Sequence, residues 1–99
     1  MLKIAISREE MRNEKMIEEY TKELDKLPKG KITPKVINGK TYYYLYFREG
    51  EKTVSKYIGK DESNLIIIRE QLARRNQVEE IIKKLKEERV KIKKLGAML

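Results

Sequence analysis

Apolar and polar residues alternate along residues 31–59, and glycine-containing pairs interrupt the alternation twice. Asn38-Gly39 supplies the positive-φ pair that a two-residue type I′ turn requires, and Glu49-Gly50 is a second turn signal. The pattern therefore predicts an antiparallel meander of three strands, over residues 31–37, 40–48 and 51–59. Pro34 has no amide hydrogen to donate to a neighbouring strand, which places the first strand at an edge and the second at the centre.

The two turns also predict the register of the strands. The first turn places Lys35 opposite Tyr42 and Thr33 opposite Tyr44. The second turn predicts the pairs Arg48–Glu51, Tyr46–Thr53, Tyr44–Ser55 and Tyr42–Tyr57. Because side chains alternate across a strand, the sheet has two distinct faces. One face is apolar and is expected to face the core: Ile32, Pro34, Val36, Tyr43, Leu45, Phe47, Val54 and Ile58.

Helical periodicity flanks the strands on both sides. Ser7 followed by Glu10 forms a capping box, which predicts a helix over about residues 8–27 that ends at Pro28. A second helix is predicted over about residues 63–95, with a plausible stop at Gly96. Its apolar stripe is interrupted at residues 74–77 and changes phase there, so either one long helix changes partner or two helices meet at a bend. We favour one long helix.

From Val78 onward the second helix has near-heptad spacing, which predicts pairing with the first helix or with another chain. The expected fold is α+β, with the order α-β-β-β-α in a single domain over residues 1–99.

Composition narrows the functional classes. The chain has 99 residues, a net charge of +8, no Cys and no His. The commonest metal ligand and general base are therefore absent, and we expect no enzyme, no metal site and no cofactor. No apolar run reaches the ~18 residues of a membrane span. We expect a cytoplasmic protein.

Positive charge is concentrated on the predicted sheet. Residues 28–60 carry eight basic and two acidic residues, a net charge of +6, whereas residues 1–27 carry −1 and residues 61–99 carry +3. A thermophilic or AT-rich source would explain many charges but not the scarcity of carboxylates on the sheet. Local positive charge is typical of proteins that bind polyanions.

The second face of the sheet combines aromatic, hydroxyl and basic side chains, and this composition predicts a nucleic-acid-binding surface. With the basic residues near the turns, the predicted binding residues are Lys31, Thr33, Lys35, Lys40, Tyr42, Tyr44, Tyr46, Arg48, Lys52, Ser55, Tyr57 and Lys60. A second group of basic residues lies on the predicted long helix and consists of Arg69, Arg74 and Arg75. This group would either extend the binding surface or be part of an ordinary solvent-exposed helix surface.

Other interpretations of the same residues stay open. Tyr is a good strand former whose rings pair across strands, and a helix covering this face would make it a second core layer. Tyr and Arg also anchor protein interfaces, so the chain could inhibit or regulate a nucleic-acid enzyme such as an RNA-guided nuclease. A homodimer through the carboxy-terminal helix is a third option. A tyrosine nucleophile for DNA-strand transfer lacks the arginine cluster that it would need.

The Leu-Pro-Lys-Gly segment at 27–30, the Tyr-rich hairpin and the Lys-Tyr-Ile-Gly-Lys segment at 56–60 together resemble a signature of small proteins from bacteria, archaea and mobile elements. The resemblance covers about residues 24–72. The hairpin is also similar to the arm-site DNA-binding domain of tyrosine recombinases (phage integrases). That domain is a three-stranded sheet backed by a helix, and its sheet enters the DNA major groove. The resemblance implies DNA contacts by Lys35, Tyr42, Tyr44, Tyr46, Arg48, Ser55 and Tyr57. This chain departs from the pattern in its Tyr-rich sheet, in its long preceding helix and in the absence of a following catalytic domain.

Overall fold

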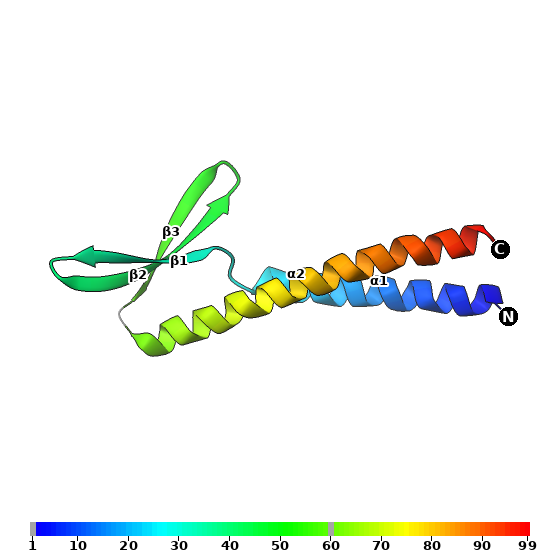
Figure 1. Cartoon of the computed structure of the whole chain (residues 1–99), viewed down its shortest axis with the longest axis horizontal. Helices are drawn as coiled ribbons and strands as arrows, with labels where there is room; N and C mark the ends of the chain where they lie inside the picture. Colours follow the sequence, from blue (N-terminus) through cyan, green and yellow to red (C-terminus); the bar gives the residue numbers. More distant parts are fainter. Residues whose placement is uncertain (1, 60) are drawn as a thin grey trace. The chain divides into compact units, whose positions relative to one another are not determined.

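The computed structural model describes residues 2–59 and 61–99. Its elements follow the predicted α-β-β-β-α order, which confirms the α+β class (Figure 1). They are α1 (Leu2–Lys26), β1 (Lys31–Ile37), β2 (Lys40–Glu49), β3 (Lys52–Gly59) and α2 (Glu62–Ala97).

The chain divides into two compact units. One unit joins α1 to the part of α2 that follows Arg75, and the other comprises residues 27–75 with the whole sheet and the start of α2. The boundary in α2 therefore falls inside the stretch 74–77, where the apolar stripe changes phase. As predicted, α2 is one continuous helix, and its two parts belong to different packing units.

The helical unit is an antiparallel hairpin in which both termini lie at the same end (Figure 1). Its α2 part buries apolar side chains at heptad spacing: Val78, Ile82, Leu85 and Ile92. The facing positions of α1 are buried or partly buried at the same spacing: Ile6, Glu10, Asn13, Ile17, Tyr20 and Leu24. Such a seam is the packing of a two-stranded coiled coil. The heptad pattern of α2 therefore pairs with α1 of the same chain.

Asn13 is a polar residue that is buried in this seam. Its side chain is 3% exposed, and its Nδ2 donates a hydrogen bond of 2.9 Å to the carbonyl oxygen of Leu85. Its Oδ1 is buried and has no hydrogen-bond partner among the described residues. A single Asn in a coiled-coil seam commonly sets the register at a cost in stability.

α1 begins at Leu2, so the predicted start at Arg8 with a Ser7 cap is wrong. The capping motif is overridden by packing. Ile6 lies in the seam, with its Cγ2 3.6 Å from the position that a Cβ on Gly96 would occupy. Because α1 begins before Ser7, Ile6 is part of the helix and lies beside Gly96 of α2. A helix that began after a cap at Ser7 would leave Ile6 outside this packing.

The sheet has the strand order β1-β2-β3 with β2 at its centre, as predicted. The first register is confirmed, with Lys35 opposite Tyr42 and Thr33 opposite Tyr44. The Asn38-Gly39 turn has φ values of 51° and 77°, as a type I′ turn requires.

The predicted register of the β2–β3 hairpin is wrong, because its two-residue loop lies one residue later in the chain than predicted. The loop is Gly50-Glu51, so the pairs are Glu49–Lys52, Arg48–Thr53, Tyr46–Ser55 and Tyr44–Tyr57. Gly50, with φ 63°, occupies the first loop position, where type II′ turns favour glycine. The error moves each partner by two residues, which leaves the side chains of residues 52–57 on their predicted faces. The register shifts again between Tyr43 and Tyr44, where Tyr43 faces Gly59.

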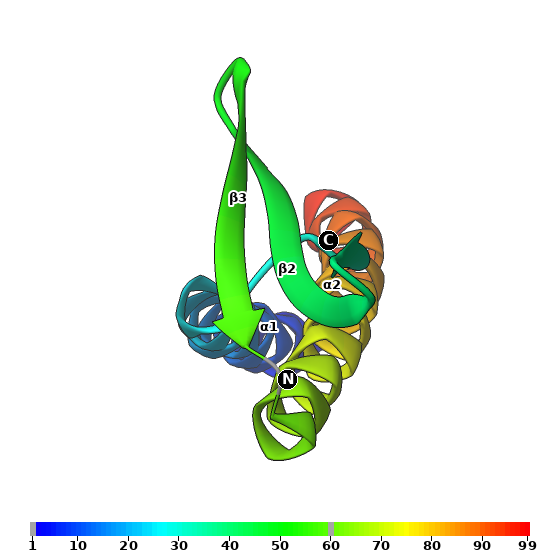
Figure 2. The ribbon, with the colours of Figure 1, turned by 90° about the vertical axis from the view of Figure 1, so that its left-hand side faces the viewer.

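The core of the sheet unit is small. Leu45 on β2 and Leu65 on α2 are each 5% exposed. Val36, predicted on the core face, is 69% exposed, and Pro34 is also exposed. The prediction of an apolar face buried along its whole length is therefore wrong, because burial is confined to the surroundings of Leu45. Figure 2 shows the β2–β3 hairpin, which twists along its length.

Two contacts fix how the sheet unit begins and ends. Gly30 has φ 117°, and a Cβ there would collide with the carbonyl oxygen of Tyr46 and lie 2.8 Å from Cβ of Phe47. At the other end of the unit, Arg75 Nη1 donates a hydrogen bond of 3.0 Å to the carbonyl oxygen of Leu27. The segment before β1 is thus held against both β2 and α2.

Candidate nucleic-acid interface

Four tyrosines form a continuous aromatic cluster on one face of the sheet. The ring of Tyr44 lies 5.4 Å from that of Tyr57 and 6.4 Å from that of Tyr46, and Tyr42 lies 6.3 Å from Tyr57. The interplanar angles lie between 47° and 53°, so the rings are tilted and do not stack face to face. Alternation along β2 and the Tyr44–Tyr57 pairing bring these rings together.

Basic side chains border the tyrosine cluster. By the register of the strands, Lys31 pairs with Tyr46, Lys35 with Tyr42, and Arg48 with Thr53. All three are exposed. Nζ of Lys35 lies 5.9 Å from the centre of the Tyr44 ring, within the range of a cation–π contact. Among the described residues, no carboxylate occupies a strand position on this face, because Glu49 pairs with Lys52 on the opposite one.

An open hollow of about 230 Å³ lies on the tyrosine face and is lined by Ile37, Tyr42, Tyr44 and Tyr57. Tyr57 is 52% exposed and Ile37 is 41% exposed. Every lining residue comes from a strand, so the hollow opens on the sheet itself. Sequence reasoning missed Ile37, although its odd position in β1 and its pairing with Lys40 place it on this face.

The remaining predicted residues fall into three groups. Lys40 and Ser55 are exposed and Thr33 is partly buried, and all three lie on the tyrosine face. Lys52 lies on the opposite face, beside the second turn. Lys60 lies outside the described residues.

The three arginines on α2 that were predicted to extend the binding surface differ in their exposure. Arg69 is exposed, whereas Arg74 and Arg75 are partly buried. Arg75 holds the carbonyl of Leu27, which is a structural role within the sheet unit. The three arginines therefore do not share one environment.

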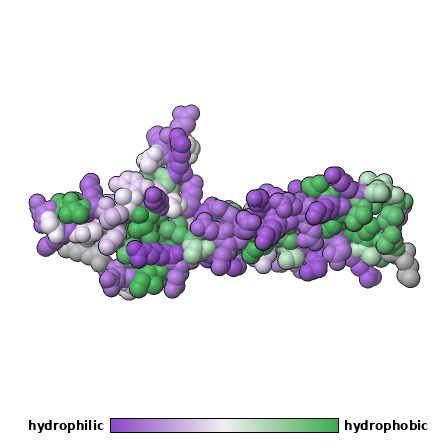
Figure 3. Space-filling view, in the orientation of Figure 1, coloured by the Kyte–Doolittle hydropathy of each residue, from purple (hydrophilic) through white to green (hydrophobic). Residues whose placement is uncertain are grey.

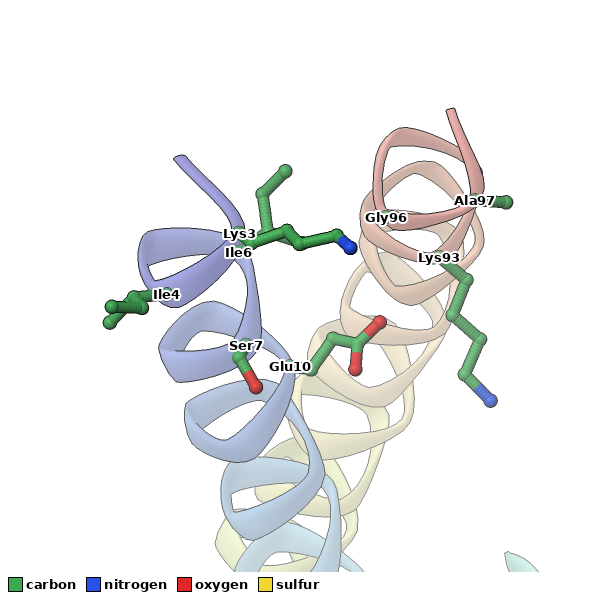
Figure 4. Close-up of a pocket in the computed structure, with 8 residues that line it drawn as sticks. All are labelled: Lys3, Ile4, Ile6, Ser7, Glu10, Lys93, Gly96 and Ala97. Carbon is green, nitrogen blue, oxygen red and sulfur yellow. The ribbon is translucent and has the colours of Figure 1, made fainter. Parts of the chain in front are cut away.

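A separate depression of about 560 Å³ lies on the helical hairpin near the chain termini (Figure 4). Lys3 and Glu10 extend from α1 toward α2 beside Gly96, and Lys93 points outward. Hydrophobic side chains gather at the same end of the hairpin (Figure 3), and those that are largely exposed are Leu2, Ile4, Leu95, Met98 and Leu99. This end has mixed charge and no aromatic ring among the residues that line the depression. Aromatic and basic side chains are combined on the sheet instead.

Within residues 2–59 and 61–99, no three acidic, Cys or His residues cluster closely enough to hold a metal ion. In the same part of the chain, no helix is both long and apolar enough to span a bilayer. Asp61 caps α2: hydrogen bonds from the Ser63 side chain and backbone amide lower the pKa of its carboxyl.

Comparison with known proteins identifies a family. The model of a domain of unknown function (DUF6788) matches residues 6–66, from early in α1 to the start of α2. The matched region contains the whole sheet, including the tyrosine cluster. Neither the search of curated proteins nor that of solved structures finds a match.

Proposed function

The chain belongs to the DUF6788 family, and we propose that it binds nucleic acid, DNA in preference to RNA, through the tyrosine face of its sheet. It does so without catalysing a reaction. The observation that carries this proposal is the combination of four clustered tyrosines with exposed basic residues on one sheet face. Aromatic rings beside a positively charged track are the two parts of a typical nucleic-acid-binding surface.

The basic residues would supply most of the affinity. Lys31, Lys35 and Arg48 are exposed, and none of the described strand positions on this face carries a carboxylate that would compete with a phosphate for them. Phosphate contacts of this kind also position a protein on its ligand. The hydroxyl groups of Ser55 and the tyrosines would add hydrogen bonds to phosphate oxygens.

The preference for DNA rests on shape. A β-ribbon fits the major groove of B-form DNA, whereas the major groove of duplex RNA is too deep and narrow for protein side chains to read. The β1–β2 hairpin is exposed on both faces near its turn. Val36, on the face opposite the tyrosines, is 69% exposed, and Lys35, on the tyrosine face, is also exposed. Such a free hairpin end has room to approach a groove.

A matched pair of charge variants tests the proposal. Lys35→Gln with Arg48→Gln removes two positive charges from the tyrosine face. Lys83→Gln with Lys86→Gln removes two from exposed positions on α2, in the helical unit. Binding of labelled single-stranded and duplex DNA is measured by fluorescence anisotropy at low salt.

We expect the sheet variant to lose at least tenfold in affinity and the helix variant to change little. Equal losses in both variants would mean that net charge alone attracts DNA. Absence of DNA binding by the wild-type protein would refute the proposal and would favour a protein partner for the same face.

A further inference from the structure

We infer that the hollow between Ile37, Tyr42, Tyr44 and Tyr57 receives an unpaired nucleobase, so that a single strand binds in preference to a duplex. This inference rests on the proposed function and chooses between two ways in which the tyrosine face could bind DNA. In one mode, the sheet docks into the groove of a duplex. In the other, bases outside a duplex stack on the tyrosine rings.

The orientation of the rings favours unpaired bases. In a duplex, the flat faces of the bases are covered by neighbouring base pairs, and only base edges reach the grooves. A tyrosine ring can therefore stack on a base only when that base is unpaired. Tyr44 and Tyr57 are tilted by 53° and do not stack face to face, so their flat faces are not paired with each other. The exposed fraction of Tyr57, 52%, leaves part of its surface open to a ligand.

The size of the hollow also suits one base. Its volume, about 230 Å³, is smaller than the ~300–1,000 Å³ of pockets that enclose drug-sized ligands. The described residues that line it contribute three aromatic rings and one aliphatic side chain, and none of them is charged. A flat, weakly polar ring system is the ligand that such walls contact best, and a nucleobase is the part of a nucleic acid with these properties.

The surrounding charge fits a strand that follows the sheet surface. Lys35 lies beside the hollow, with its ammonium group 5.9 Å from the Tyr44 ring centre. Lys40 pairs with Ile37 at one edge, and Lys31 pairs with Tyr46 on the other side of the cluster. Phosphates on either side of a base held in the hollow would thus each have a cation within reach.

The first test compares single-stranded and duplex DNA of the same sequence. The labelled oligonucleotide has about 12 nucleotides, within the length that single-strand-binding sheets contact. We expect the single strand to bind more tightly than the annealed duplex. Tyr44→Leu, which removes the ring and keeps an apolar side chain, should weaken single-strand binding by about 5- to 150-fold, as the loss of one stacked base predicts. Tyr44→Phe retains the ring and removes only the hydroxyl, so it should lose clearly less affinity than Tyr44→Leu.

A second measurement does not depend on loss of affinity. The chain contains no Trp, so Tyr57→Trp introduces a single indole fluorophore into the hollow. Stacking of a base on the indole should quench its emission when single-stranded DNA is added, and duplex DNA should not quench it.

The outcomes separate the two proposals. Duplex binding that equals or exceeds single-strand binding, or quenching by both forms, would overturn the inference and leave the proposed function standing. No binding of either form would overturn both. A single-stranded RNA of the same sequence that binds better than the DNA would retain the unpaired base and refute the preference for DNA.

Discussion

Asn13 offers the sharpest test of how the helical hairpin is held together. Its side chain lies in the coiled-coil seam at 3% exposure, and its Oδ1 has no hydrogen-bond partner among the described residues. We predict that Asn13→Leu stabilises the protein. The substitution replaces a buried polar group by an apolar side chain of comparable size at a heptad position.

The magnitude follows from three contributions. Burying an unsatisfied polar group costs on the order of 1–3 kcal/mol, and the substitution removes this cost. Burying a leucine side chain contributes roughly 1.5–3 kcal/mol, of which only part is realised because the Asn methylene is already buried. The loss of the 2.9 Å hydrogen bond to the Leu85 carbonyl opposes these gains by about 0.5–1.5 kcal/mol. The net expectation is a gain of about 1–3 kcal/mol.

The assay is urea unfolding followed by circular dichroism. A gain of 1 kcal/mol should also raise Tm by about 4–8 °C in a chain of this size. Asn13→Asp is the matched control, because it keeps the shape and buries a charge, and it should destabilise. An Asn13→Leu protein no more stable than wild type would refute the reasoning and would indicate that Oδ1 is hydrogen-bonded, for instance by a buried water.

The substitution also tests the role of Asn13 in specificity. A buried Asn restricts coiled coils to one register and one oligomeric state. Asn13→Leu should therefore associate more readily than wild type, which light scattering measures. This result would also bear on the predicted homodimer, since the seam of α2 is occupied by α1 and the exposed apolar positions on α2 include Val90 and Leu95.

Three further predictions concern the sheet unit. Gly30→Ala should destabilise the protein by about 2 kcal/mol or more, measured by thermal unfolding, because φ is 117° and the new methyl would meet the Tyr46 carbonyl. Gly39→Ala is the control: its φ of 77° is also positive, but the space around its Cβ is open, so it carries the backbone strain without the collision and should destabilise less. The logarithm of the association constant for single-stranded DNA should fall with the logarithm of the salt concentration, with a slope near −3. This value assumes one phosphate contact for each of the four basic residues on the tyrosine face and about −0.7 per contact. A slope near zero would contradict phosphate binding. In an NMR titration, the pKa of Asp61 should lie below its usual value, and it should rise in the Ser63→Ala variant. Because the pKa is lowered in the folded state, Asp61 stabilises the protein at pH values above its unfolded-state pKa. This contribution is lost as the pH falls through the folded-state pKa.

The amino-acid sequence alone determined the elements and the faces of the sheet. Asn38-Gly39 specified the first hairpin because few other pairs adopt two positive φ values. The period of two along a strand made the assignment of Tyr42, Tyr44 and Tyr46 to one face robust. Even the error in the second turn shifted the pairing of β3 by two residues and kept residues 52–57 on the same sides.

The tertiary structure decided what depends on contacts between distant residues. The start of α1 at Leu2 places Ile6 beside Gly96, far away along the chain, and no local motif reports such a proximity. Likewise, burial on the sheet is confined to the surroundings of Leu45. Val36 lies outside this packed region and is therefore exposed, and the hollow beside Ile37 is left open. Periodicity specifies the side to which a residue points, because it is a property of the local backbone. Whether that side is covered is set by the rest of the chain, and this is the reason that the faces were predicted correctly while their burial was not.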